Sequence, residues 1–100
     1  MIRHIVMFRL KDFVNESEKL MAAKEVIKHL DELPAKINVI RKYEAGIDVR
    51  KLSWSYDIVL IMDFDTMADL EIYTVHPAHQ EFITFNKEYS VDKACIDYEV

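Results

Sequence analysis

The sequence has very few of the residues that interrupt or cross-link a chain. Its 100 residues include one glycine, two prolines and one cysteine, and no serine- or glycine-rich stretch divides them. A single cysteine excludes an internal disulfide framework. Cys95 stands in an apolar-rich stretch, so we expect a small buried side chain rather than a reactive thiol. We therefore expect one packed domain, residues 1–100, that depends on its apolar core.

Clusters of positive charge are also missing. Thirteen lysine and arginine residues are outnumbered by eighteen aspartate and glutamate residues, which gives a net charge of −5 with histidine neutral. The densest basic segments are the pairs Arg41-Lys42 and Arg50-Lys51. Phosphate backbones repel a negative chain without a basic patch, so we expect no nucleic-acid partner.

Long hydrophobic runs are absent as well. The longest purely apolar run, residues 58–62, is far shorter than a membrane span. Arg3 and Arg9 interrupt the apolar residues near the start, which argues against a targeting peptide. We therefore expect a cytoplasmic protein with no membrane partner.

Apolar residues alternate with the period of a strand in four segments. Residues 2–10 and 54–64 carry apolar side chains on both faces, which is typical of strands covered on both sides. Residues 37–49 and 94–100 complete the set, and Gly46 indicates a bulge or bend in the first of these two.

The first helix is predicted between residues 15 and 34. Residues 15–18 resemble a capping box, and an amphipathic stripe follows until Pro34 ends the helix. The inward-facing residues of this stripe are Leu20, Ala23, Val26, Ile27, Leu30 and Leu33.

A second helical stretch is predicted to be broken in two. Asp65 or Thr66 caps its first part, whose inward stripe includes Leu70 and Tyr73. The pair His76-Pro77 interrupts it, because proline suits the first position of a new helix, which then reaches about residue 89.

The predicted order of elements is βαββαβ. This order is typical of the α+β, ferredoxin-like fold, in which helices cover one face of a four-stranded antiparallel sheet. A monomer would expose the apolar side chains of the other face as one patch, and such patches usually mark interfaces. We therefore expect a homodimer formed through the sheet face.

Several motifs resemble the stress-responsive A/B barrel domain family. The most specific is residues 69–80, where a tyrosine precedes His-Pro-x-His. Weaker matches lie at residues 4–10, 33–34, 43–46, 55–60 and 97–98. The resemblance covers nearly the whole chain and implies a dimeric α+β barrel. The family includes a plant cyclase that closes a polyketide ring by aldol condensation without metal or cofactor.

Two residues of the specific motif are candidates for chemistry. His79 is either a satisfied core histidine or a general base, because imidazole titrates near neutral pH and can take a proton from carbon next to a carbonyl. Tyr73 either packs on the apolar stripe or donates a hydrogen bond to a developing enolate oxygen. The resemblance implies catalytic roles for both residues, since they match the cyclase's histidine and its paired tyrosine.

Two polar residues on strands accompany them. His4 is a structural histidine or, as the resemblance implies, a residue on the floor of a ligand pocket. The resemblance also implies that Asp97 lies near the site. We expect Asp97 to orient His79 by accepting its other N–H, or else to face the surface.

The expected pocket has apolar walls from Phe8, Val26 and Phe82. The cyclase has a tyrosine at the position of Val26, so this wall would be less polar here. His76 is explained by its place before Pro77, as a helix cap.

A zinc site would need three or four convergent ligands. A set formed by His76, His79 and His4 would depend on a capping histidine that is poorly aimed for a metal, so we expect neither metal nor cofactor.

Three functions remain open. The protein could bind an unknown small molecule in a cleft between helices and sheet. It could be a cofactor-independent lyase or cyclase that uses His79 as base and Tyr73 as oxyanion donor. It could instead be a stress-protective structural dimer without a ligand. Dimeric ferredoxin-like barrels also include haem-degrading and quinol-oxidising monooxygenases, which rank lowest because no haem-ligand pattern is present.

Overall fold

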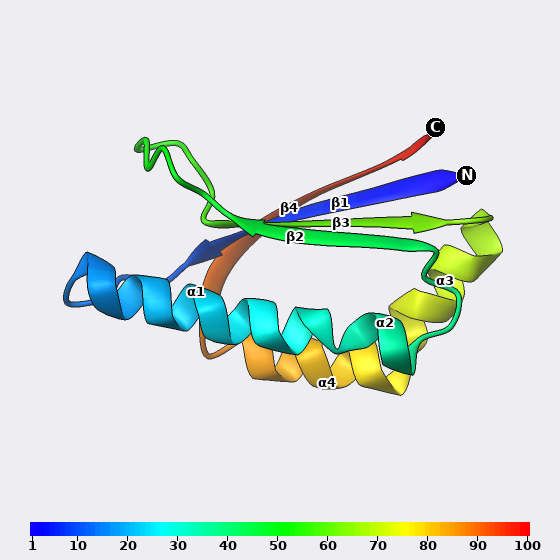
Figure 1. Ribbon diagram of the computed structural model, residues 1–100, viewed down its shortest axis with the longest axis horizontal. Coiled ribbons are helices and arrows are strands. Elements are labelled where there is room, and N and C mark those ends of the chain that lie inside the picture. Colours follow the sequence, from blue (N-terminus) through cyan, green and yellow to red (C-terminus); the bar gives the residue numbers. More distant parts are fainter.

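A computed structural model describes all 100 residues of the chain. Its elements are β1 (Ile2–Leu10), α1 (Glu16–Asp31), α2 (Leu33–Lys36), β2 (Lys42–Ile47), β3 (Ile58–Phe64), α3 (Met67–Val75), α4 (Pro77–Asn86) and β4 (Ser90–Glu99). The four strands form one antiparallel sheet in the order β2-β3-β1-β4. The helices lie as a second layer against one face of this sheet (Figure 1). The predicted ferredoxin-like α+β fold is confirmed.

The core lies between the sheet and the helix layer. Alternate residues of β1 and β3 point toward the helices, and they meet the apolar stripe of α1 and residues of α3 and α4. The most enclosed members each have no more than 1% of their surface exposed, and they are Val26, Leu30, Ile37, Leu60, Met62, Phe64 and Tyr73. Burial of this apolar surface is the main favourable term that holds the two layers together.

The helix starts follow the predicted capping chemistry. The Asn15 Oδ1 atom accepts a hydrogen bond from the Glu18 N–H at 2.9 Å, and the Thr66 Oγ1 atom accepts one from the Asp69 N–H at 3.1 Å. These bonds satisfy N–H groups that have no partner inside a helix. The prediction that Pro34 ends the first helix is wrong in detail. It lies in the first turn of α2, where its missing N–H costs nothing.

The ends of two strands differ from the predictions. β2 begins at Lys42 rather than at residue 37, because Ile37 caps the end of α2 and packs into the core with 1% exposure. β3 begins at Ile58 rather than at residue 54. Trp54 lies in the preceding loop and is 73% exposed, so its apolar side chain is not evidence that the strand begins there.

The irregularity of the sheet lies elsewhere than predicted. Gly46 pairs with Val59 in an uninterrupted register, so the predicted bulge at this glycine is wrong. The register shifts instead between Arg9 and Leu10, where β1 pairs with the start of β4. β4 itself begins at Ser90, four residues before the predicted strand.

The other face of the sheet has no helix over it (Figure 1). Its large apolar residues are Ile5, Met7, Val59, Ile61, Ile96 and Tyr98. Among them the Arg3 Nε and Nη2 atoms donate to the two carboxylate oxygens of Asp63 at 2.9 and 3.0 Å. Asp63 is 2% exposed, and the guanidinium holds the pKa of its carboxyl below the usual range. None of the helices is both long and apolar enough to cross a membrane.

Candidate functional site

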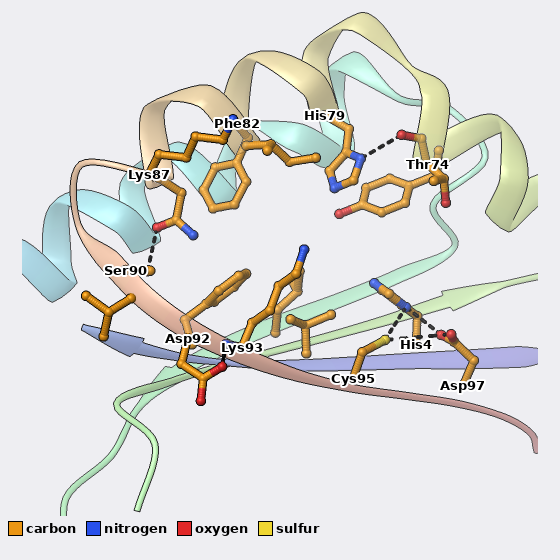
Figure 2. Close-up of a pocket in the computed structure, with 17 residues that line it drawn as sticks. His4, Thr74, His79, Phe82, Lys87, Ser90, Asp92, Lys93, Cys95 and Asp97 are labelled. Carbon is orange, nitrogen blue, oxygen red and sulfur yellow. Dashed lines mark hydrogen bonds and ion pairs between the residues drawn. The ribbon is translucent and has the colours of Figure 1, made fainter. Parts of the chain in front are cut away.

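A cavity of about 620 Å³ lies between the second pair of helices and the β1–β4 side of the sheet. α4 and the end of α3 form its roof, and the helix-facing residues of β1 and β4 form its floor (Figure 2). β4 is the edge strand, and most of its residues are exposed, so the cavity is open on this side. Its volume falls within the range of small-molecule sites.

The break between α3 and α4 determines how His79 is held. Pro77 has no N–H, and the next N–H, that of Ala78, donates to the Nδ1 atom of His76 at 3.0 Å. This bond confirms the predicted capping role of His76. The Thr74 carbonyl is left without its helical donor and accepts a hydrogen bond from the His79 Nδ1 atom at 2.9 Å (Figure 2). Because a carbonyl can only accept, the Nδ1 atom carries the proton and the Nε2 atom keeps its lone pair.

The surroundings of His79 favour its neutral form. Burial lowers the pKa of the imidazole, and the neighbouring His4 and Lys93 side chains lower it further, against an opposing effect of the hydrogen bond to Thr74. At neutral pH the side chain is therefore an uncharged imidazole with a basic Nε2 atom.

Tyr73 lies beside this imidazole. The two ring centroids are 4.3 Å apart, and the His4 ring lies 5.8 Å from Tyr73 on its other side. Burial raises the pKa of the Tyr73 phenol, and no hydrogen bond contributes to this rise. The phenol therefore remains protonated and is a free donor at the cavity. Tyr73, His79 and His4 line one cavity, in agreement with the expected geometry, while their roles remain predictions.

Asp97 occupies a different place from the one predicted. It is the direct cross-strand partner of His4, and the His4 Nδ1 atom lies 2.5 Å from its carboxylate oxygen. The predicted hydrogen bond from His79 to Asp97 is wrong, because the Thr74 carbonyl takes the His79 Nδ1–H instead.

Cys95 lies next to this pair and is exposed, so the prediction of a buried side chain is wrong. Its Sγ atom is 3.8 Å from the His4 Nδ1 atom and 3.7 Å from a carboxylate oxygen of Asp97. The physical reason for the error is that Cys95 faces the open cavity rather than packed side chains.

The apolar walls agree with the prediction in two of three positions. Phe8 and Phe82 both line the cavity and meet edge to face, with ring centroids 6.0 Å apart. Val26 does not line it. This residue is completely buried in α1, which packs toward β2 on the far side of the helix layer.

Several cavity residues were not identified from the sequence. The Asn86 Oδ1 atom accepts a hydrogen bond from the Ser90 hydroxyl at 2.9 Å at one end of the cavity. Lys93 extends from β4 into the cavity (Figure 2), and it takes part in none of the six ion pairs of the chain. The alternation of β4 would have found Lys93, since it shares a strand face with Cys95 and Asp97.

The fold and the comparisons agree on the class of protein. An antiparallel sheet of order β2-β3-β1-β4 with helices on one face places the chain among the ferredoxin-like α+β proteins. The sequence profile of the stress responsive A/B barrel domain matches residues 2–100, so the chain belongs to this family.

Three relatives illustrate the range of the family and its fold. An uncharacterized protein of Streptomyces coelicolor is 30% identical over 100 residues, which cover 99% of each chain. A dimeric protein of unknown function and ferredoxin-like fold from Bacteroides fragilis is 36% identical, with a TM-score of 0.86 over 99% of this chain and 95% of that one. A hydroxynitrile lyase from Passiflora edulis has a TM-score of 0.80 over 99% and 92% of the two chains, but its 16% identity shows a shared fold alone.

Proposed function

We propose that the chain is a homodimeric binding protein whose protomers each hold a small molecule in the cavity between helices and sheet. The observation that carries the proposal is the pair of free polar groups at the roof. The Tyr73 phenol offers a proton, the His79 Nε2 atom offers a lone pair, and neither has a partner within the chain. Both atoms face the cavity rather than packed protein, so a ligand can bind them in place of water.

The lining defines the kind of ligand. Val6, Phe8 and Phe82 supply an apolar surface that suits an aromatic ring or a short aliphatic chain. The polar end of the ligand contacts Tyr73 and His79. It therefore needs a hydrogen-bond acceptor for the Tyr73 hydroxyl and, next to it, a donor or an acidic C–H group for the His79 Nε2 atom. An aryl or alkyl ketone with a neighbouring hydroxyl group fits this description.

A binding experiment tests this function. The affinities of a panel of hydroxylated aryl ketones are measured by titration calorimetry for the native chain and for Tyr73→Phe. Loss of one hydrogen bond in a closed site weakens binding by roughly tenfold. Tyr43→Phe is the matched control, because the Tyr43 hydroxyl bonds to Asp31 outside the cavity. Equal affinities of native and Tyr73→Phe chains would contradict the proposed binding mode.

The homodimer is supported by the uncovered apolar face of the sheet and by the Bacteroides fragilis relative, which is described as dimeric. A cytoplasmic location stays a prediction from the sequence. The stress-protective role without a ligand is disfavoured by the open cavity, since a purely structural protein gains nothing from free polar groups inside it.

A second candidate is a cofactor-independent lyase or cyclase, and the tautomer of His79 favours it. The Nε2 lone pair could take a proton from carbon next to a carbonyl, and the C–H electron pair would move to the carbonyl oxygen as the enolate forms. The Tyr73 phenol could donate a hydrogen bond to that oxygen. Since burial keeps the phenol protonated and the imidazole neutral, both groups are in the form this step requires.

Deuterium exchange separates the enzyme from the binder. Hydrogen atoms next to the carbonyl of a bound ketone are followed by NMR in deuterated water. An enzyme exchanges them, and His79→Ala slows the exchange by about 10²–10⁴-fold. A binder leaves the exchange at the rate of the free ketone.

A further inference from the structure

We propose that His4, Cys95 and Asp97 form a site for one zinc ion at the floor of the cavity. This site differs from the histidine set considered in the sequence and shares only His4 with it. It is independent of the proposed binding function, which needs no metal.

The backbone itself brings the three side chains together. Cys95 and Asp97 are two residues apart on β4, so they point to the same side of the strand. Asp97 faces His4 directly across the antiparallel β1–β4 pair. The three side chains therefore converge on the helix-facing side of the sheet, where Figure 2 shows them grouped below the roof of the cavity.

The distances fit a tetrahedral ion. The Cys95 Sγ atom lies 3.8 Å from the His4 Nδ1 atom and 3.7 Å from the Asp97 Oδ2 atom. Ligand atoms on tetrahedral zinc, with bonds of 2.0–2.3 Å, are separated by about 3.5 Å. The His4 Nδ1 and Asp97 Oδ1 atoms are closer, at 2.5 Å, because they share a proton. Zinc would replace this proton, and a small rotation of either side chain would open the pair.

The charges balance. A thiolate and a carboxylate together supply two negative charges, and neutral imidazole supplies a third ligand of the borderline kind that zinc accepts. Binding releases the thiol proton of Cys95 to solvent, and the proton on the His4 Nδ1 atom moves through solvent to Nε2, so that the imidazole stays neutral.

The position of the ion has a consequence for the cavity. Three protein ligands leave the fourth corner of the tetrahedron open. Since all three ligands line the cavity, this corner opens to water or to an oxygen atom of a bound molecule. The His4 ring is kept in place by edge contacts with Tyr73 and Phe64, at centroid distances of 5.8 and 6.4 Å.

The test uses the reduced, metal-free chain and zinc alone. Titration calorimetry measures stoichiometry and affinity, and a thiol-specific reagent measures the reactivity of Cys95, which is the single cysteine of the chain. We expect one zinc per chain and at least about tenfold slower modification of Cys95 at saturating zinc, because a coordinated thiolate is no longer free to attack. Cobalt in place of zinc should give a thiolate-to-cobalt absorption band.

Variants locate the site. Cys95→Ser, His4→Gln and Asp97→Asn should each weaken zinc binding by at least about tenfold, since even outer partners of ligands have effects of this size. The control is His29→Gln, which removes a histidine that stacks on Phe85 outside the cavity and should leave the affinity unchanged.

Two outcomes overturn the proposal. One is zinc affinity that is the same in Cys95→Ser as in the native chain, which would mark adventitious binding elsewhere. The other is Cys95 reactivity in the native chain that zinc does not change. The second measurement needs no variant, so it decides the question even if a substitution prevents folding.

Discussion

The Nδ1 atom of His79 lies 2.9 Å from the carbonyl oxygen of Thr74, five residues earlier in the chain. This oxygen is available because the Ala78 N–H, which would be its helical donor, bonds to the His76 side chain at the break between α3 and α4. The break at His76-Pro77 therefore sets both the direction in which the imidazole points and the nitrogen that carries its proton.

The lowered pKa of His79 predicts a pH dependence of stability. In the unfolded chain His79 becomes protonated below about pH 6.5, whereas in the folded chain it stays neutral to a lower pH. The free energy of unfolding should therefore fall as the pH drops through about 6.5. It should level off below the folded pKa. The groups that face the imidazole are Tyr73, His4, His76 and Lys93.

Urea denaturation of the native chain and of His79→Gln between pH 8 and 5 would measure this effect. Glutamine does not titrate, so the variant should lack this part of the slope. The difference between the two chains at pH 8 reports packing alone and serves as the reference. Identical slopes in the two chains would show that His79 is not held in its neutral form by the fold.

The uncovered face of the sheet predicts how the dimer can be broken. Ile5→Asp or Ile61→Asp would place a carboxylate in the apolar centre of this face. An unpaired buried charge costs several kcal/mol, so we expect the dimer to weaken by at least about 100-fold. Sedimentation at micromolar concentration should show monomers for both variants. Val14→Asp, at a position that is 89% exposed, should remain dimeric. A native chain that sediments as a monomer would refute the dimer altogether.

Lys93 predicts a preference for anionic ligands. Its ammonium group has no partner in the chain and extends from the floor into the cavity (Figure 2). A carboxylate on an aryl ligand should therefore strengthen binding, and Lys93→Met should remove this gain of about 3- to 10-fold. The neutral amide of the same ligand is the control, because its affinity should not respond to Lys93→Met. Equal effects on acid and amide would point to altered packing rather than to charge.

The last residues of the chain predict a requirement for folding. Residues 95–100 pair with the start of β1 and complete the sheet. Their deletion would leave Ile2, Arg3 and His4 without backbone partners on one side, and it would expose an apolar strand edge. We expect the truncated chain to aggregate on expression. A soluble truncation that unfolds cooperatively in urea would contradict this expectation.

The sequence predicted the element types because burial repeats with different periods in strands and helices. It misplaced the starts of β2 and β3, since the apolar side chains of Ile37 and Trp54 lie outside strands, one packed in the core at the end of α2 and the other in an exposed loop. Periodicity reports which residues are apolar, and it does not distinguish a strand from an irregular segment that is packed equally well.

The part of the candidate site that depends on one local motif could be predicted from the sequence. The His76-Pro77 break aimed Tyr73 and His79 at one space, and this could be argued from the chain alone. The partner of Asp97 could not, because it depends on the register between the first and last strands. The exposure of Cys95 depends on the open space that the helices leave above β4, which no local pattern records.

The pairing of β1 with β4 also affects the order of events during synthesis. Ile2 faces Glu99 across these strands, so one edge of β1 stays unpaired during synthesis. Its partner strand, β4, leaves the ribosome almost a full chain length later. Pairings between such distant segments form slowly, and a half-paired apolar strand can recruit other nascent chains in the meantime. The interval before β4 emerges is therefore the stage at which aggregation competes most directly with folding.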